Sequence, residues 1–236
     1  MILHTYKNKF YSLFLLIHIL IMKNNYIHPP FLSCSSWSIF NGTTKEFLFG
    51  SAEHQRREIA SLTKLMTAYT ALQIVKKYEL DIYEQNIDVD NQSVGLRGIS
   101  ANLSEDDTLC LYDLLHGVLI PSGNDASHCV ASFLGEILET SGKKLQSQDR
   151  SPIQYFISEM NLNATKLNMK STNYANTTGL ANPYNKSTAY DIGLLALSAI
   201  RDPIIKDIVR KKEYTCVAFD FLGDENFIDG IQQINY

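Results

Sequence analysis

The chain has 236 residues, of which 45% are hydrophobic and 19% are charged, and its formal net charge is -4. This composition excludes a disordered tail, a collagen-like fibre and a basic nucleic-acid-binding protein, so no nucleic-acid partner is expected. With only 12 glycines and 6 prolines, the chain is not expected to contain a long flexible linker. Its length favours one compact globular domain.

The N-terminal part of the sequence differs from the rest. Two lysines precede an apolar run from Phe10 to Met22, after which the sequence becomes polar again. A positive stub followed by about a dozen apolar residues is typical of a secretory signal, and is shorter than the roughly 20 residues of a membrane span. We therefore predict a signal peptide or short hydrophobic anchor in residues 1–30 and a folded domain in residues 31–236.

This interpretation makes the chain secreted or extracytoplasmic, with a membrane as a partner where the apolar segment is retained as an anchor. A buried N-terminal helix is the alternative, because no small-x-small cleavage site precedes Pro29.

The cysteines and histidines carry no recognisable metal pattern. The four cysteines are Cys34, Cys110, Cys129 and Cys216, and no two of them have the spacing of a zinc clip. We predict that they are small buried residues, with a Cys110–Cys129 disulfide as the alternative in a secreted chain. The six histidines are equally dispersed, so the sequence predicts no metal site.

The folded region is predicted to begin with a β-hairpin and a buried helix. Short apolar segments at Ser35–Phe40 and Glu46–Phe49 flank an Asn-Gly pair at Asn41, which is the strongest local hairpin signal. From Ser61 to about Tyr78, apolar residues recur at spacings of three and four with alanines between them. This pattern predicts a helix that is apolar on most of its circumference. Residues 80–107 are polar and irregular and predict a loop.

The middle of the chain is predicted to be helical. One helix is expected over Thr108–Ile120, followed by a break at Pro121–Asn124. Asp125 then caps a second helix, which ends near Ser141. A third helix is expected from Ser151 to about Leu167.

The last predicted elements are a loop, a helix and a strand. Residues 172–186 are rich in Asn, Thr and Gly and predict a loop. Thr188 and Asp191 have the spacing of a capping box for a helix that runs through Ile200. Glu213–Phe219 alternates between polar and apolar residues and predicts a strand.

Ser61 and Lys64 are the first candidates for catalysis. Side chains three residues apart share one face of a helix, so the hydroxyl and the amine can touch. A serine is a weak nucleophile until a neighbouring base takes its proton, and desolvation lowers the pKa of a lysine enough to make it that base. The helix N-terminus adds backbone N–H groups that suit an oxyanion.

The same Ser-x-x-Lys spacing recurs at Ser141 and Lys144, and the motif is expected about once by chance in such a chain. Ser141 lies in a polar turn with no apolar helix to desolvate Lys144. Ser61, in contrast, opens the most apolar helix of the chain. Position therefore favours the first pair over the second.

A second motif, Ser122-Gly123-Asn124, follows about sixty residues later in a turn between two helices. The Ser122 hydroxyl could pass a proton between Lys64 and a leaving amine. The Asn124 amide could hold both the lysine and a substrate carbonyl, because it donates and accepts. Taken alone, these residues are typical of a turn and a cap, but together with Ser61 and Lys64 they favour a catalytic group.

These motifs resemble those of the serine-type D-alanyl-D-alanine carboxypeptidases, the low-molecular-weight penicillin-binding proteins of peptidase family S11. The resemblance runs from about Ser35 to Phe219. The matching segments are Ile59–Ala68, Ser122–Ala126, Met160–Asn161, Ala164, Leu167, Met169, Thr172, Gly179–Leu180 and Ser187–Asp191.

The resemblance implies an α+β fold of the β-lactamase/transpeptidase type, with an antiparallel sheet covered by helices, a mostly helical lobe, and the active site between them. It implies that Ser61 forms the acyl-enzyme, that Lys64 is its base, and that Ser122 and Asn124 complete the proton relay and the substrate contact. The implied substrate is a peptide that ends in D-Ala-D-Ala, and β-lactams such as penicillin would acylate the same serine. No metal and no organic cofactor are implied.

The chain departs from the family pattern near its C-terminus. The third motif, Lys-Thr-Gly, is absent from the sequence; Asp229-Gly230-Ile231 resembles what often precedes it, but Gln232 follows. The C-terminal strands are therefore predicted to be incomplete. In the family that strand supplies an oxyanion-hole N–H, and losing one such donor costs about 10² to 10³ in turnover. The alternatives to an active enzyme are a catalytically impaired member that acts as a binding module, and a truncated sequence.

One further motif points to another activity. Glu159-Met160-Asn161-Leu162-Asn163 spells the Glu-x-x-Leu-Asn of class A β-lactamases, in which the glutamate would activate a deacylating water. We favour coincidence over this β-lactamase-like alternative, because Met160, Asn161 and the residues from Ala164 to Thr172 follow the carboxypeptidase pattern and place Glu159 on a helix.

Overall fold

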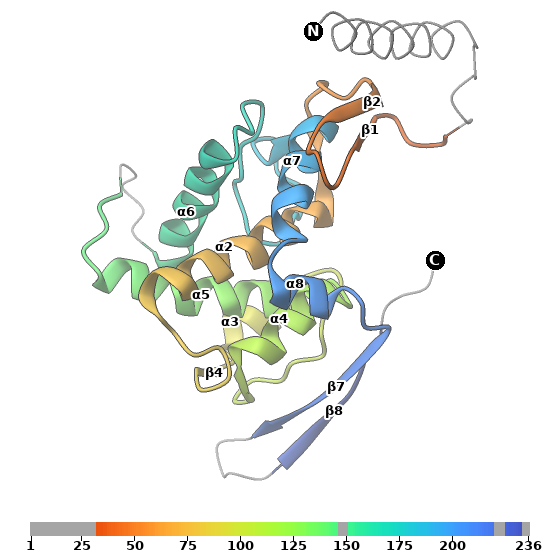
Figure 1. The fold of residues 1–236 in the computed structure, drawn as a ribbon. Helices are drawn as coiled ribbons and strands as arrows, with labels where there is room; N and C mark the ends of the chain where they lie inside the picture. The colour runs from red at the N-terminus through yellow and green to blue at the C-terminus, as the bar shows by residue number, and fades with distance from the viewer. Residues whose placement is uncertain (1–31, 146–150, 220–224, 233–236) are drawn as a thin grey trace, which may run out of the picture. The chain divides into compact units, whose positions relative to one another are not determined.

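The computed structural model of the chain describes residues 32–145, 151–219 and 225–232 (Figure 1). The chain divides into two compact units, Met1–Ser35 and Ser36–Tyr236, and the elements below belong to the second. The predicted signal or anchor in residues 1–30 lies outside the described residues. Within the described ranges, no helix is long and apolar enough to cross a membrane.

The second unit combines short strands with helices. In chain order they are β1 (Trp37–Phe40), β2 (Phe47–Ser51), β3 (Arg57–Glu58), the 3₁₀ turn η1 (Ala60–Leu62), α2 (Thr63–Tyr78), β4 (Asn86–Asp88), α3 (Asn91–Val94), β5 (Thr108–Cys110), α4 (Leu111–Leu119), α5 (Asn124–Thr140), α6 (Pro152–Lys166), β6 (Lys186–Ser187), α7 (Ala189–Ala199), α8 (Pro203–Ile208), β7 (Glu213–Phe219) and β8 (Glu225–Gln232).

All described strand pairs are antiparallel. β1 pairs with β2, β3 pairs with β6, and a four-stranded sheet has the order β4-β5-β7-β8. The predicted hairpin is confirmed as β1 and β2, with Ile39 opposite Phe49. Its connection is stabilised by the Asn41 side chain, whose Oδ1 accepts hydrogen bonds from the backbone N–H groups of Thr43 and Thr44, as Asx turns do.

The helix α2 lies at the centre of the helical packing. It contacts α4, α5, α6 and α7, and Figure 1 shows it passing between α6 and α4. Met66, Leu72 and Ile74 on this helix are each at most 1% exposed. The prediction of a helix buried on most of its circumference is therefore confirmed, because apolar or small residues occur on every side of it.

Residues 80–107 are more ordered than predicted. They contain β4 and α3, and Thr108–Cys110 forms β5 rather than the start of a helix. The strand forms because it pairs with β4, where the Thr108 hydroxyl donates to Asp88 Oδ1 at 2.6 Å. The helix α4 therefore begins at Leu111. The short helix α8 was not predicted; its N-cap is Asp202, which accepts from the Ile204 N–H at 3.0 Å.

Asp125 does not cap α5 as predicted. The N-cap is Gly123, and the Asp125 carboxylate instead accepts hydrogen bonds from the backbone N–H groups of Ala101 and Leu103 and from the Ser100 hydroxyl. Because Asp125 is only 3% exposed, these donors compensate for the burial of its charge. The residue thus fixes the loop before β5 against the start of α5.

The cysteines are all free thiols, so the alternative of a Cys110–Cys129 disulfide is wrong. Cys129 and Cys216 are buried as predicted, whereas Cys110 is half-buried and Cys34 is exposed. No group of His, Cys, Asp and Glu side chains in the described ranges is arranged to hold a metal ion.

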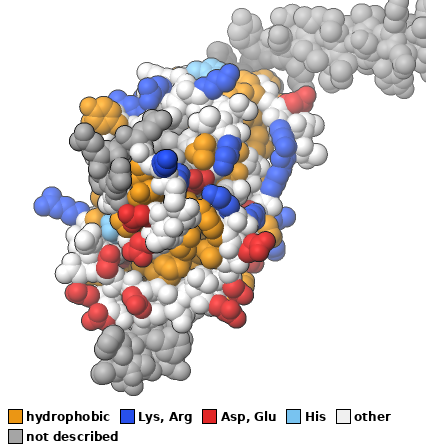
Figure 2. Space-filling view, turned by 90° about the vertical axis from the view of Figure 1, so that its left-hand side faces the viewer, with side chains coloured by type: hydrophobic (Ala, Val, Ile, Leu, Met, Phe, Trp, Pro, Cys, Tyr) orange, Lys and Arg blue, Asp and Glu red, His pale blue; other side chains and the backbone are white. Residues whose placement is uncertain are grey.

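The face of the molecule in Figure 2 carries charged side chains of both signs. On the face in Figure 2, basic side chains lie mostly in the upper half and acidic side chains mostly in the lower half, with hydrophobic side chains between them. The face therefore lacks the continuous basic stripe that typifies a nucleic-acid-binding surface.

Candidate active site

Ser61 lies in the 3₁₀ turn that leads into α2, and Lys64 lies one turn later, inside the helix. Ser61 is exposed, whereas Lys64 is only 3% exposed. The exposed hydroxyl and the buried amine follow from the local sequence, because the apolar α2 sinks into the core immediately after the turn. The start of the helix therefore combines an exposed serine with a buried, desolvated lysine.

The buried amine of Lys64 has two uncharged partners. Its Nζ donates to Asn124 Oδ1 at 2.7 Å and to the Thr178 carbonyl oxygen at 2.7 Å. Burial lowers the pKa of Lys64 to about 8, and the negative charge of Asp125 opposes this shift. About a tenth of such lysines are neutral at pH 7, so Lys64 can act as a proton acceptor near neutral pH.

The turn before α5 brings Asn124 of the second motif into contact with Lys64. Asn124 accepts from Lys64, while its Nδ2 donates to the Arg97 carbonyl at 2.6 Å. Ser122 adopts the left-handed backbone conformation with φ 64°, which costs energy in a non-glycine residue. The Ser122 hydroxyl oxygen is buried and has no hydrogen-bond partner in the described part of the chain, so this group can accept or donate a further bond.

The backbone at Thr177 and Thr178 is a part of the site that the sequence did not identify. The Thr177 carbonyl accepts from the Thr67 hydroxyl at 2.7 Å and from the Ser127 hydroxyl at 2.6 Å. These two bonds join the segment to α2 and α5, and they hold the next carbonyl, of Thr178, against Lys64. Backbone carbonyls carry no sequence signature, although the buried hydroxyls that hold this segment are visible as unusual polar residues on apolar helices.

Gly179 explains how this segment reaches the nucleophile. Its φ is +85°, and a Cβ atom added there would lie 1.9 Å from the Ala60 carbonyl oxygen and 2.9 Å from the Ser61 nitrogen. Only glycine permits such close approach with positive φ. The segment therefore packs directly against the backbone of Ser61.

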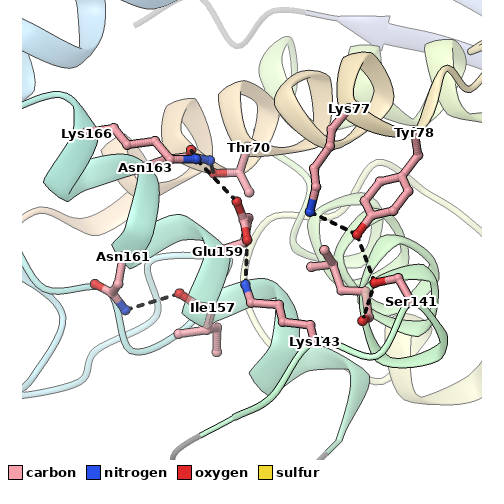
Figure 3. Close-up of polar contacts among 11 residues, drawn as sticks. Thr70, Lys77, Tyr78, Ser141, Lys143, Ile157, Glu159, Asn161, Asn163 and Lys166 are labelled. Carbon is pink, nitrogen blue, oxygen red and sulfur yellow. Dashed lines mark hydrogen bonds and ion pairs between the residues drawn. The ribbon is translucent and has the colours of Figure 1, made fainter.

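Glu159 of the β-lactamase-like motif lies on α6, as expected, and faces two lysines. Its carboxylate forms ion pairs with Lys143 and with Lys166, the latter at 3.8 Å (Figure 3). The side chain is only 7% exposed, and its two carboxylate oxygens are each engaged by one of the two lysines. The geometry thus gives Glu159 a structural role between α6 and the end of α5.

The second Ser-x-x-Lys pair does not form a serine–lysine contact. The Ser141 hydroxyl accepts from Tyr78 at 2.8 Å and donates to the Leu138 carbonyl at 2.8 Å (Figure 3). Lys144 is exposed, so its amine keeps the ordinary hydration that a general base would have to lose. The preference for Ser61 and Lys64 over this pair agrees with the geometry.

Comparisons with known proteins identify the family of this chain. The sequence profile of the peptidase S11 family, described as D-alanyl-D-alanine carboxypeptidase, matches residues 23–228. D-alanyl-D-alanine carboxypeptidase DacD of Escherichia coli is 31% identical over 73% of this chain and 42% of its own length. The D-alanyl-D-alanine carboxypeptidase of Streptomyces sp. strain K15 is 28% identical over 88% of this chain and 68% of its own length. The chain thus spans about two fifths of the DacD relative.

The fold comparison agrees with the sequence comparison. The crystal structure of the Streptomyces K15 DD-transpeptidase matches with a TM-score of 0.75 and 25% identity, over 88% of this chain and 75% of that one. The structure of DacD from Francisella tularensis matches with a TM-score of 0.68 and 25% identity, over 78% of this chain and 41% of that one. The predicted α+β fold of the β-lactamase/transpeptidase type is confirmed. The chain belongs to the peptidase S11 family of serine D-alanyl-D-alanine carboxypeptidases.

Proposed function

We propose that this chain is a serine-type D-Ala-D-Ala carboxypeptidase that releases the terminal D-Ala from peptidoglycan-type peptides and is acylated by β-lactams. One observation carries the proposal: the amine of Lys64, three residues after Ser61, is buried and its pKa is lowered to about 8. The names of the relatives, which include D-alanyl-D-alanine carboxypeptidases and a D-alanyl-D-alanine endopeptidase, supply the substrate class.

In the acylation step, neutral Lys64 takes the hydroxyl proton of Ser61 as Ser61 Oγ bonds to the carbonyl carbon between the two D-Ala residues. The tetrahedral intermediate collapses when the C–N bond breaks. The leaving amine of D-Ala takes a proton from the Ser122 hydroxyl, which is refilled from Lys64. Asn124 keeps the Lys64 amine in place and offers its amide to the substrate.

In the deacylation step, a water molecule gives a proton to Lys64 and attacks the ester carbon of the acyl-enzyme. The C–O bond to Ser61 breaks, and Ser61 Oγ recovers its proton from Lys64. The peptide leaves with a new carboxylate. Every step uses side chains of this chain.

The same proposal covers the location and extent of the functional unit. A signal peptide or short anchor in residues 1–30 would carry a catalytic domain in residues 31–236 to the extracytoplasmic side, where peptidoglycan peptides occur. The pattern of two lysines and an apolar run from Phe10 to Met22 supports this part.

The test is the intact mass of the purified chain before and after exposure to benzylpenicillin, with Ser61→Ala as the control. We expect one penicillin mass to be added to the wild type and none to Ser61→Ala. An adduct that persists for many minutes argues for a carboxypeptidase, whereas an adduct lost within seconds argues for the β-lactamase-like alternative.

The second candidate is a family member that binds peptides without turnover. The absence of Lys-Thr-Gly from the sequence, with Gln232 following Asp229-Gly230-Ile231, is the observation that favours it. A wild-type chain that is folded by near-ultraviolet circular dichroism, forms no adduct and still binds a D-Ala-D-Ala peptide would replace the enzyme proposal with this one.

A further inference from the structure

Three threonines form a buried polar row on the otherwise apolar helix α2. Thr63, Thr67 and Thr70 are spaced by four and three residues, so they share one face of the helix, and each is 0% exposed. A buried hydroxyl costs free energy unless it has a hydrogen-bond partner. The closest partner of each hydroxyl lies outside α2, so the row fastens other segments of the chain to the helix that carries Lys64.

Thr67 differs from its neighbour in the row by the kind of partner that it holds. The Thr70 hydroxyl accepts from a side chain, Asn163 Nδ2 on α6, at 3.2 Å (Figure 3). The Thr67 hydroxyl donates to backbone, the Thr177 carbonyl, at 2.7 Å. The same carbonyl accepts a second bond at 2.6 Å from the hydroxyl of Ser127, which lies on α5 and is 0% exposed. Two helices thus hold one carbonyl.

The turn that contains Thr177 is closed by its own hydrogen bonds. The Asn176 side chain spans it: Oδ1 accepts from the Gly179 N–H at 2.7 Å, and Nδ2 donates to the Leu180 carbonyl at 2.9 Å. A turn closed in this way moves as one piece. The two bonds at the Thr177 carbonyl therefore also fix the carbonyl of Thr178.

The Thr178 carbonyl bears on how the Lys64 amine is oriented. A neutral amine has two N–H donors and one lone pair. Lys64 Nζ has two acceptors, Asn124 Oδ1 and the Thr178 carbonyl, each at 2.7 Å. In the neutral form both N–H groups are therefore occupied, and the lone pair is left to accept a proton. Without the Thr178 carbonyl, one N–H would lose its partner and the amine could rotate about the Cε–Nζ bond.

We propose that Thr67 and Ser127 are positioning residues for the acylation step. By holding the Thr177 carbonyl from two helices, they fix the turn that orients the Lys64 amine. The inference rests on the proposed function and adds two residues to it, both of which act through the backbone of the turn.

The first test is the rate at which benzylpenicillin labels Ser61 at pH 8, followed by intact mass. Thr67→Val keeps the shape of the side chain and removes its hydroxyl, as Ser127→Ala does on α5. We expect each to slow labelling roughly three- to tenfold and the double variant to slow it about 10²-fold, the size of effect that a misplaced catalytic group causes. Thr67→Ser, which keeps the hydroxyl, should label at about the wild-type rate.

Thr70→Val is the matched control for Thr67→Val. Both variants remove a fully buried threonine hydroxyl from the same face of α2, and both leave one former partner unpaired. They should lose similar stability in urea titrations, but only Thr67→Val should slow labelling. Equal slowing in the two variants, or slow labelling in Thr67→Ser, would show that stability alone is measured and would overturn the proposal.

The second test follows the titration of Lys64 by NMR in chains labelled with ¹³C at the lysine Cε, with the signal assigned by its loss in Lys64→Arg. An ammonium gains more than a neutral amine from a carbonyl acceptor, so loss of the Thr178 carbonyl should lower the titration midpoint. We expect a fall of about one pH unit in the double variant and none in Thr70→Val. Asp125, the charged group that acts on Lys64 in the described part of the chain, is kept in every variant.

A midpoint that stays or rises in the double variant overturns the proposal, because the carbonyl would then still be in place or would act only by excluding water. Should the double variant fail to fold by near-ultraviolet circular dichroism, the two single variants decide by the same criterion.

The two readouts separate this inference from the proposed function. Labelling of every variant at the wild-type rate overturns the positioning role and leaves the enzymatic function standing. A midpoint that falls in a chain that penicillin never labels supports the orientation of Lys64 by the turn and overturns the enzymatic function.

Discussion

Lys64 concentrates the chemistry of the site in one residue, because only its neutral form can accept the Ser61 proton. Burial lowers the pKa of Lys64 to about 8. Below that pH, the neutral fraction of Lys64 rises about tenfold for each unit by which the pH is raised. The rate of Ser61 acylation by benzylpenicillin should therefore rise with pH and level off above about 8. A rate that is independent of pH between 6 and 9 would argue against Lys64 as the base.

Replacing Lys64 with arginine tests the same residue, because the side chain keeps its positive charge at low pH but cannot become neutral at higher pH. Lys64→Arg keeps a positive group, but the guanidinium stays protonated at every accessible pH. We expect acylation to fall by about 10² to 10⁴ at pH 8, the usual size of general-base assistance. The measurement is the rate of adduct formation by intact mass, with near-ultraviolet circular dichroism to verify folding.

Gly179 provides a prediction about geometry alone. Gly179→Ala places a methyl group 1.9 Å from the Ala60 carbonyl, at a φ of +85°. Gly142→Ala is the matched control, because its φ is +80° and nothing lies within 4 Å of the added Cβ. The control should lose about 1–2 kcal/mol of unfolding free energy from backbone strain, and Gly179→Ala about 1–3 kcal/mol more from overpacking.

Urea unfolding measures both variants, and the acylation rate is the second readout. Gly179→Ala should slow the labelling of Ser61, because the methyl group pushes against the backbone that carries it. Equal stability losses in the two variants would show that the close approach at Gly179 does not constrain the site.

Among the helices and strands, those predicted best from the sequence are the ones whose signals lie within their own residues. The hairpin β1–β2, the helices α2, α6 and α7, and the strand β7 all follow from periodicity, turn residues or caps within the element itself. The strand β5 was missed because it depends on pairing with β4, some twenty residues earlier, and no local pattern encodes that partner. The contact between the Thr178 carbonyl and Lys64 could not be predicted for the same reason, because it depends on tertiary contacts between residues far apart in the sequence.

β7 is attached to α4 by a group of buried polar and aromatic side chains. His116 on α4 is fully buried and stacks on the ring of Tyr214, with 3.6 Å between the ring centroids. Its Nδ1 donates to the Tyr112 carbonyl at 2.9 Å, and its Nε2 lies 3.0 Å from the Lys211 amine. A carbonyl only accepts and an ammonium only donates, so this imidazole is neutral in the folded chain.

Acid should therefore weaken this attachment. Burial lowers the pKa of His116 below its ordinary value of 6.5, and Lys211 lowers it further, while Asp113 and Asp207 oppose the shift. The unfolded chain binds a proton near pH 6.5 and the folded chain does not, so stability falls as the pH drops below about 6.5. His116→Phe, which can keep the stacking, should lose less stability than the wild type between pH 7 and pH 5 in urea titrations. An identical pH dependence in the two chains would exclude His116 as the cause.

At the scale of the whole second unit, an apolar groove lies between β1, α2, α7 and α8 in the described part of the chain. Its volume is about 430 Å³, and its lining includes Phe40, Leu65, Ala196, Leu197, Ile200 and Val209. The capping box at Thr188 and Asp191 predicts the helix α7, but it cannot say which side of that helix lines a groove. Ile200 and Val209 are 46% and 47% exposed, so the groove offers more apolar surface to water than scattered single residues do.

This groove should bind a neutral apolar dye. We expect Nile red to gain fluorescence with the folded chain, because the groove removes it from water, and to lose most of that gain in Ala196→Asp, which places a charge in the lining. Thr140→Asp, at the exposed C-terminal end of α5, adds the same charge elsewhere and should leave the fluorescence unchanged. The Asp carboxylate should weaken binding because it has no partner on the neutral dye and has to keep its hydration. Unchanged fluorescence in Ala196→Asp would show that the dye binds at some other surface. The apolar lining of this groove would then be too shallow to exclude water.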